Sequence, residues 1–423
     1  MSGPARVGIV ADDFTGANDA AGHFGELGWT AFSSTGLGLP DPSPGVLVLN
    51  SRSRFLDGPG VLRATAGAWR AMRGCGFQAA HFYQKMDSTL RGRPEAQAEG
   101  LLASTGAGMV FVVPAYPAQG RLTLGGAHWV GGVRLDRSEY ARDPLSPATT
   151  HRVDRILDGA WSWHVRLSLV QAGPRALART IQERRRRSPR LRFFTFDAAE
   201  EGHLACIARA GLALGCRAWA GASGLAQALA RELAGGRPGA PRPGPGSGVV
   251  VAAGSISQTS LDQLAEAERQ GLGTWLALRK GDYLGPRRTR PVAVAPGGRV
   301  ALLSTLKRRE EAWEALRLAA ARGWSPQSLG RAAVSALVER AFRLRRDGWA
   351  LLLTGGHTAE AYCERAGWTG LWVAGELLPG IPYGRSAGGS GSGGWVATKP
   401  GGFGRKGDLA RALRLLLEGK KGR

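Results

Sequence analysis

The sequence predicts an α/β protein with two domains, each built on a mostly parallel sheet. Two observations support this fold class. Short apolar runs alternate with longer segments of helical periodicity, the order typical of parallel strands joined by helices. Near the middle of the 423-residue chain, residues 236–248 are dominated by Gly and Pro, a composition that cannot bury a core. We therefore expect a domain at 1–235, a linker at 236–248 and a second domain at 249–423.

The first predicted domain contains short apolar runs that read as buried strands. They lie at 7–11, 46–50, 81–85, 109–113 and 193–196, and helical stretches between them include 17–27 and 60–73. An antiparallel hairpin is expected at 128–135, because Gly131-Gly132 can adopt the positive φ angles of a two-residue turn.

The second predicted domain opens with an apolar strand at 249–253 that runs into Gly254-Ser255. Further strands are expected at 299–303, 350–354 and 371–374, with a helix at 359–365 and another near the end of the chain. A Gly/Ser-rich loop spans 388–394. The order of elements again favours a mostly parallel sheet.

The formal net charge of +23 is the unusual bulk property. Such a charge is compatible with nucleic acid, an anionic membrane surface or small anionic substrates as partners. Arginine, Ala, Gly and Pro are all abundant, which is typical of compositional bias, and the dense run Arg184–Arg187 follows a helical stretch and reads as a solvated face. Because no nucleic-acid-binding motif accompanies the charge, we expect no nucleic-acid partner.

The remaining composition is that of an ordinary globular protein, with 43% hydrophobic and 21% charged residues. No apolar run approaches the roughly 20 residues needed to cross a bilayer, and nothing marks a signal peptide. The four cysteines lie far apart without a C-x-x-C pair, which argues against a disulfide framework or a cysteine metal site. We expect a cytoplasmic protein with no membrane partner.

Acidic and hydroxyl residues follow the first strand in Ala11-Asp-Asp-Phe-Thr-Gly-Ala17. In open α/β sheets, ligands bind beyond the carboxyl ends of the strands. Asp12 could therefore hold a substrate hydroxyl or a metal, whereas the alternative is that this segment only caps the next helix.

Two further strand ends carry charged residues. Asn50-Ser-Arg-Ser-Arg54 offers Arg52 for a carboxylate or phosphate, although any single arginine in so arginine-rich a chain can be structural. The turn Lys85-Met-Asp-Ser-Thr-Leu-Arg-Gly92 combines cations, an acid and hydroxyls, which a structural turn does not need. This combination suits a polyhydroxy acid, with Lys85 and Arg91 available for its carboxylate and Asp87 for a hydroxyl.

Glycine-rich turns follow three strand candidates of the second predicted domain. Their candidate phosphate-binding residues are Ser255, Gly355, Gly356, His357, Thr358, Gly401 and Gly402. Glycines let backbone N–H groups approach phosphates, and the dipole of a following helix adds to this attraction. A Walker A motif is absent, so an ordinary P-loop is excluded.

These segments, together with 113–121, 125–128 and 141–147, resemble the four-carbon acid sugar kinase family in order over nearly the whole chain. The resemblance implies that the first domain binds a small sugar acid such as erythronate or threonate, and that the second binds ATP with Mg²⁺. It implies phosphorylation of a substrate hydroxyl. Carried over residue by residue, the substrate contacts are Asp12, Arg52, Lys85, Met86, Asp87 and Ser88, and the ATP contacts are Ser255, Gly355 to Thr358 and Gly402.

The chain departs from the family pattern at His357, where an acid is usual, and at Lys399-Pro400, where a small residue is usual. We expect Asp12 or Asp87 to orient the attacking hydroxyl, and the sequence does not choose between them. The identity of the metal ligands, the particular acid and the number of subunits stay open, and a homo-oligomer is compatible with the sequence. Alternatives are a different transferase or a lyase using the same pocket, or a non-catalytic nucleotide- or anion-binding regulator.

Overall fold

The computed structural model describes residues 6–36, 40–41, 43–143, 146–157, 161–234, 243–244, 246–285 and 298–419. The chain divides into two compact units, Met1–Gly239 and Ala240–Arg423, called here the N-terminal and C-terminal units. Most of the predicted linker lies outside the described residues, so the domain boundaries stay a prediction.

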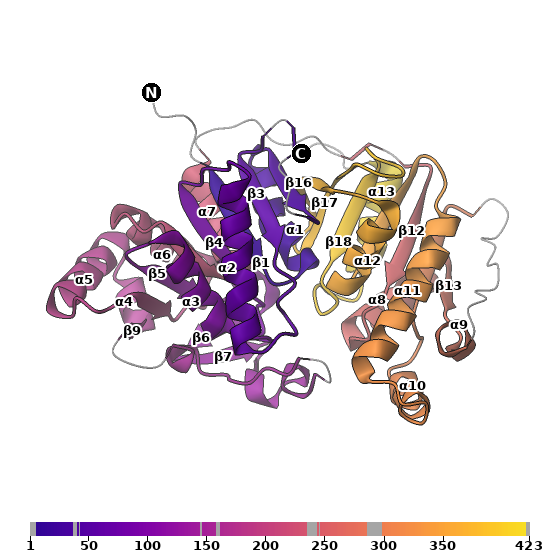
Figure 1. Ribbon diagram of the computed structural model, residues 1–423, viewed down its shortest axis with the longest axis horizontal. Coiled ribbons are helices and arrows are strands. Elements are labelled where there is room, and N and C mark those ends of the chain that lie inside the picture. The colour runs from indigo at the N-terminus through magenta and orange to yellow at the C-terminus, as the bar shows by residue number, and fades with distance from the viewer. Residues whose placement is uncertain are drawn as a thin grey trace. The chain divides into compact units, whose positions relative to one another are not determined.

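The N-terminal unit is a parallel sheet with helices on both faces (Figure 1). Its strands are β1 (Val7–Ala11), β2 (Ala31–Ser34), β3 (Val46–Asn50), β4 (His81–Lys85), β5 (Val110–Val113), β9 (Ser162–Val165), β10 (Phe193–Phe196) and β11 (Ala218–Gly221). They are ordered β2-β3-β1-β4-β11-β5-β10-β9, and every neighbouring pair is parallel.

Among the helices of this unit, α2 packs with α3 on one face and α1 packs with α7 on the other, and α7 also packs with α6. They are α1 (Phe14–Glu26), α2 (Gly58–Gly74), α3 (Pro94–Thr105), α4 (Leu167–Gln171), α5 (Pro174–Arg187), α6 (Glu201–Ala213) and α7 (Ser223–Leu233). Trp69 of α2 and Trp219 of β11 are fully enclosed, which places the core between sheet and helices.

A small antiparallel sheet extends this unit through β6 (Arg121–Leu124), β7 (Ala127–Val130) and β8 (Val133–Arg134). The predicted hairpin is confirmed: Gly131 and Gly132 connect β7 and β8 with φ angles of 58° and 81°. Short 3-10 turns occupy Pro117–Gln119, Leu135–Arg137, Glu139–Arg142 and Val153–Arg155.

The C-terminal unit has a mixed sheet ordered β13-β14-β12-β15-β18-β17-β16. Its strands are β12 (Gly248–Ala253), β13 (Thr274–Ala277), β14 (Val300–Ser304), β15 (Trp349–Thr354), β16 (Gly370–Leu378), β17 (Ile381–Ala387) and β18 (Trp395–Lys399). From β13 to β18 the pairs are parallel, whereas β17 pairs antiparallel with both β18 and β16. The predicted mostly parallel α/β class is thus confirmed, with an antiparallel addition on one side.

The helices of the C-terminal unit again cover both faces of its sheet (Figure 1). They are α8 (Gln258–Arg269), α9 (Lys280–Leu284), α10 (Glu310–Ala320), α11 (Pro326–Leu344), α12 (Gly356–Ala366) and α13 (Asp408–Glu418). α8 packs with α13, and α11 packs with α12. Val251, Leu302 and Leu352 are buried on neighbouring strands and form the centre of its core.

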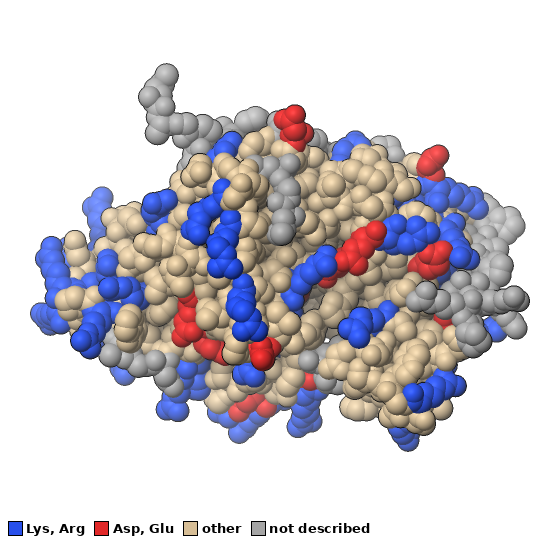
Figure 2. All heavy atoms as spheres, viewed as in Figure 1, with Lys and Arg blue, Asp and Glu red and all other residues tan. Residues whose placement is uncertain are grey.

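Positive charge is spread over the surface (Figure 2). On the face shown, a row of Lys and Arg side chains follows α2, where Arg63, Arg70 and Arg73 are exposed. Acidic side chains interrupt the basic ones elsewhere on this face. No helix in the described ranges is both long enough and apolar enough to pass through a bilayer.

Candidate functional site

The predicted substrate residues lie at one edge of the N-terminal sheet. β1 lies between β3 and β4, and Ala11 is level with Asn50 on one side and with Lys85 on the other. The turns that follow these three parallel strands therefore begin side by side. The chain runs from β1 to β3 on one side and then to β4 on the other, so this edge is the switch point where open α/β sheets bind ligands.

A buried arginine gathers the acids of these turns. The Arg54 guanidinium donates to both carboxylate oxygens of Asp12, at 2.5 and 2.8 Å. It also lies 2.7 Å from an oxygen of Asp13 and 3.4 Å from one of Asp87. We call Arg54 with these three aspartates the Arg54 cluster. Its members come from the ends of β1, β3 and β4, so one side chain ties the three turns together.

The electrostatics of the Arg54 cluster keep Asp13 and Asp87 ionised. Burial raises the pKa of Asp87, but Arg91 and Arg54 outweigh burial and hold that pKa well below its ordinary value. Burial likewise raises the pKa of Asp13, and Arg54 and Lys85 again outweigh it and lower the pKa. These carboxylates can therefore accept hydrogen bonds from hydroxyls at neutral pH.

The β4 turn is buried from Lys85 to Leu90, and Arg91 is half-buried. Lys85 Nζ donates to the carbonyl of Met86 at 2.7 Å, and Arg91 forms a two-pronged contact to Asp87 with N···O distances of 2.9 and 3.1 Å. The hydroxyl of Ser88 is buried, and in the described part of the chain it has no hydrogen-bond partner. A buried hydroxyl of this kind is a natural contact for a bound ligand.

His128, which was not among the predicted site residues, forms a hydrogen bond to the backbone of the β4 turn. His128 Nε2 donates to the Ser88 carbonyl at 2.8 Å, since a carbonyl can only accept. Its Nδ1 then accepts from the Thr123 hydroxyl at 3.1 Å. Burial lowers the pKa of His128 to about 4, so the ring stays neutral and keeps this tautomer.

The two arginines of the turn after β3 differ in exposure: Arg54 is buried and Arg52 is not. Arg52 is exposed and has a φ of 53°, a conformation that costs energy for a residue with a Cβ. The second positive φ of a non-glycine residue, 54°, belongs to Leu90 in the β4 turn. Both strained positions flank the Arg54 cluster, and strain of this kind concentrates at functional sites. Sequence reasoning singled out Arg52 and missed Arg54, because nothing in the pattern distinguishes two arginines separated by a single residue.

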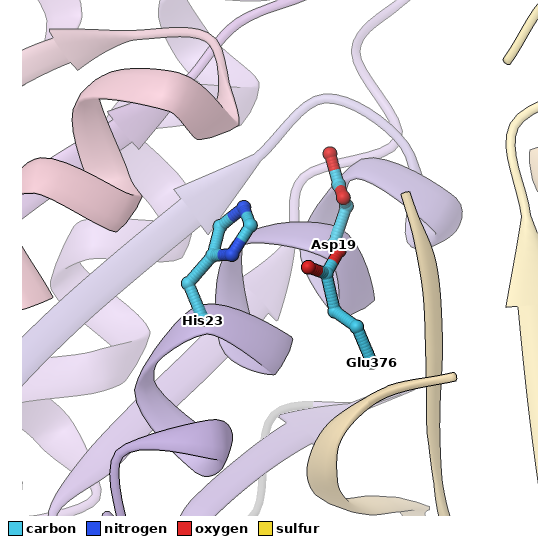
Figure 3. Close-up of side chains that lie close together, drawn as sticks. All are labelled: Asp19, His23 and Glu376. Carbon is cyan, nitrogen blue, oxygen red and sulfur yellow. The ribbon is translucent and has the colours of Figure 1, made fainter. Parts of the chain in front are cut away.

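Two titratable residues of α1 lie deeper in the N-terminal unit (Figure 3). Burial raises the pKa of Asp19 to about 6, against the opposing effect of Lys85. Burial lowers the pKa of His23 to about 3, and its ring lies 3.2 Å from the Tyr116 hydroxyl. Asp19 was not predicted, because it lies within α1 and not in the turn between the strand and the helix.

The three glycine-rich turns of the C-terminal unit also begin side by side, because the strands that precede them end at paired residues. Ala253 at the end of β12 is paired with Thr354 of β15, which is paired in turn with Lys399 of β18. β12 is the switch point of this sheet, since β14 and β15 lie on its two sides. The predicted nucleotide residues are therefore brought to one edge of one sheet.

Close backbone approach explains two of these glycines. A Cβ on Gly401 would lie 1.9 Å from Ser255 Oγ, and a Cβ on Gly254 would lie 2.1 Å from Thr358 Oγ1. The turns at 254–257, 355–358 and 400–405, called here the first, second and third turns, thus touch one another. Gly355 has a φ of 99° and precedes α12, whose N-terminus contains Gly356, the exposed His357 and the buried Thr358.

The third turn is held by side chains of α8 and of Ser257, the residue that caps this helix. The Gly401 carbonyl accepts from the hydroxyls of Ser257 and Ser260, each at 2.9 Å. Gln263 Nε2 donates to the carbonyls of Phe403 and Arg405 at 3.1 and 2.9 Å. Because carbonyls of this turn are bound to α8, its shape is fixed before any ligand arrives, and half-buried Gly402 lies within the fixed segment.

Comparison with known proteins assigns the two units to a class. Residues 7–229 match a family model described as a sugar-binding N-terminal domain, and residues 250–409 match one described as a nucleotide-binding C-terminal domain. Together they define a two-domain protein in which one domain binds a sugar compound and the other a nucleotide. The chain belongs to the four-carbon acid sugar kinase family, as its sequence motifs predicted.

Individual relatives match over almost their whole length. A D-threonate kinase of Bordetella bronchiseptica is 32% identical over 99% of this chain and 99% of its own. A 3-oxo-tetronate kinase of Methylobacterium radiotolerans is 31% identical over 97% of this chain and 99% of its own. A crystal structure from Salmonella typhimurium shares the fold, with a TM-score of 0.76 and 21% identity over 97% of this chain and 99% of its own.

Proposed function

We propose that the chain is an ATP-dependent kinase that phosphorylates a hydroxyl of a four-carbon sugar acid such as threonate or erythronate. The observation that carries this proposal is the Arg54 cluster at the switch point of the sugar-binding domain. Beside it lie Lys85 and the buried hydroxyl of Ser88, which has no hydrogen-bond partner among the described residues. Cations for a carboxylate and ionised acids for hydroxyls meet there. The 31–32% identity to kinases named for four-carbon acids supports the same substrate class.

We assign the substrate roles by charge and burial. Lys85, Arg91 and the exposed Arg52 are the candidates for the substrate carboxylate, and Asp12 or Asp87 orients the attacking hydroxyl. Phosphoryl transfer depends mostly on positioning and charge neutralisation, so a strongly basic group is not required. Asp87 is held by Arg91 and Thr89 and has a depressed pKa, which suits orientation of a hydroxyl better than removal of its proton.

The phosphates of ATP are assigned to the backbone N–H groups of the first, second and third turns, next to the N-terminus of α12. Mg²⁺ fits this site through hard oxygen donors. The hydroxyls of Ser255 and Thr358 lie where the turns touch, and the ion would take its remaining ligands from phosphates and water. When bound, the ion neutralises charge on the phosphates. A cytoplasmic location and a homo-oligomer remain expectations.

The test is ADP formation by the full chain with ATP, Mg²⁺ and a panel of four-carbon acids. Turnover with at least one acid, abolished by a chelator and restored by Mg²⁺, is expected. ATP binding without turnover of any acid would instead favour the alternative of a non-catalytic nucleotide-binding regulator. Carbon–carbon bond cleavage or group transfer without ADP would favour the lyase or other transferase.

Asp87→Asn tests the assigned roles. Loss of this carboxylate is expected to lower kcat by about 10²- to 10⁴-fold. Asp136→Asn is the matched control, since Asp136 is one-third exposed and paired with Arg134 away from the cluster. Steady-state kinetics of both folded variants decide, and unchanged turnover in Asp87→Asn would remove that residue from the mechanism.

A further inference from the structure

Lys399 is a buried cation at the junction of the three turns in the C-terminal unit. It is the last residue of β18 and only 1% exposed. Its carbonyl accepts from the N–H of Gly355 at 2.9 Å, which links it to the second turn. Its Nζ donates to the carbonyls of Pro400 and Gly401, at 2.9 and 3.1 Å, which links it to the third.

These two hydrogen bonds set the direction of the third turn's peptide groups. In a planar trans peptide the C=O and the next N–H point in opposite directions. Holding the carbonyls of Pro400 and Gly401 toward Nζ therefore turns the N–H groups of Gly401 and Gly402 away from Lys399. The hydroxyls of Ser257 and Ser260 reinforce the same orientation from α8, because they donate to the Gly401 carbonyl as well.

The charge on Lys399 is not neutralised by a contact. Within the described ranges it forms no ion pair, and the charged group that acts on it is Asp408 at the start of α13. The residues of α8 that bind the third turn are uncharged. Burial lowers the pKa of Lys399 to about 7, against the opposing effect of Asp408, so a small change in surroundings decides whether the amine is charged.

We propose that Lys399 is a positioning residue for the nucleotide, which orients the third turn toward the phosphates and adds positive charge when they bind. This inference rests on the proposed use of ATP. A bound phosphate favours the ammonium form, so ATP binding near neutral pH should be accompanied by proton uptake. Above pH 7 the neutral amine still has two N–H donors for the same carbonyls, and the third turn should stay in place while the attraction for phosphate is lost.

The experiment is calorimetric titration of the full chain with Mg²⁺–ATP, without sugar acid, at pH 7.5 in two buffers of different ionisation enthalpy. The difference in heat gives the number of protons taken up. We expect fractional proton uptake by the native protein and weaker binding at pH 8.5 than at pH 6.5. Lys399→Met should show less uptake than the native protein, a weaker pH dependence and affinity lower by about 10- to 100-fold, the usual effect of losing a charged hydrogen bond.

Lys406→Met is the matched control, because Lys406 lies beside the third turn but its side chain is 68% exposed. It should take up protons as the native chain does. Equal uptake in native protein and Lys399→Met would overturn the inference, as would absence of uptake in the native protein, a result that needs no variant. Failure of the native chain to bind ATP at all would overturn the proposed nucleotide use and, with it, the role of Lys399.

Discussion

At the scale of single residues, Arg54 and Arg52 form a natural pair for comparison. Arg54→Ala leaves the buried carboxylates of Asp12 and Asp87 and the half-buried one of Asp13 without their shared cation, so we expect the free energy of unfolding to fall by about 3–5 kcal/mol. Arg52→Ala should change it by less than about 0.5 kcal/mol, because Arg52 is exposed. Chemical denaturation measures both. Equal losses would show that the Arg54 cluster is not a stabilising unit.

His357 lies at the second position of α12, where its side chain is exposed. His357→Asp should leave the fold intact, since an acid at a helix N-terminus interacts favourably with the helix dipole. If His357 donates to phosphate or ribose, the new charge should raise the KM for ATP and leave the KM for the sugar acid unchanged. A lower KM for ATP at saturating Mg²⁺ would indicate instead that an acid there serves the metal.

Residue identities near the strand ends were largely predictable, because polar side chains after buried strands are conspicuous. Which of Arg52 and Arg54 contacts the acids was not predictable, because it depends on the backbone conformation of the turn, in which Arg52 has a positive φ. The hydrogen bond between His128 and the Ser88 carbonyl was also not predictable, because the two residues lie 40 positions apart in the chain.

At the scale of elements, α8 acts as the support of the third turn. Gln263→Ala removes two hydrogen bonds to the carbonyls of Phe403 and Arg405, so the turn should lose its fixed shape. We expect the KM for ATP to rise by about 5- to 20-fold, the range that corresponds to one or two hydrogen bonds. Gln258→Ala is the control on the same helix, because Gln258 contacts only exposed Asp262 among the described hydrogen bonds. A rise of equal size in both variants would contradict the prediction.

Strands that contain adjacent apolar residues were mostly predictable. β1, β3, β4 and β10 have the predicted bounds, and β12, β14 and β15 begin one residue from them. Four strands were missed in the main sheets of the two units because they are short or polar: β2, β9, β11 and β13. β17 was missed because glycine, proline and serine interrupt it, and β18 because its short apolar run ends in the polar residues Thr398 and Lys399. Burial against their neighbours makes both of them strands.

At the scale of the whole molecule, buried histidines predict acid sensitivity. The folded pKa values of His23 and His128, about 3 and about 4, lie below the ordinary 6.5. The unfolded chain therefore binds protons at these two histidines first, so their contribution to stability is complete above pH 6.5 and is lost as pH falls. At pH 6 the loss is roughly 1 kcal/mol per histidine, partly offset by protonation of Asp19.

Thermal unfolding of the full chain between pH 8 and pH 6 checks this expectation. His128→Gln keeps a donor for the Ser88 carbonyl but does not titrate. It should show a smaller fall in Tm over this interval than the native protein. The pKa values of Asp13 and Asp87 are lowered, so the stability that these two carboxylates contribute changes with pH only below about pH 4. They therefore do not affect the comparison between pH 8 and pH 6. An identical fall in both proteins would contradict the assignment.

The Arg54 cluster also limits how this protein can evolve. Its four charges belong to three separate turns, yet each is tolerable only while the others are present. The effects of substitutions within such a set are strongly non-additive, so the first change is costly and later ones can be nearly free. A lineage that altered Arg54 alone would lose fitness before it could alter its partners. New substrate preferences should therefore arise at the margins, at Arg52 or around Ser88, while the four charges are inherited as a block.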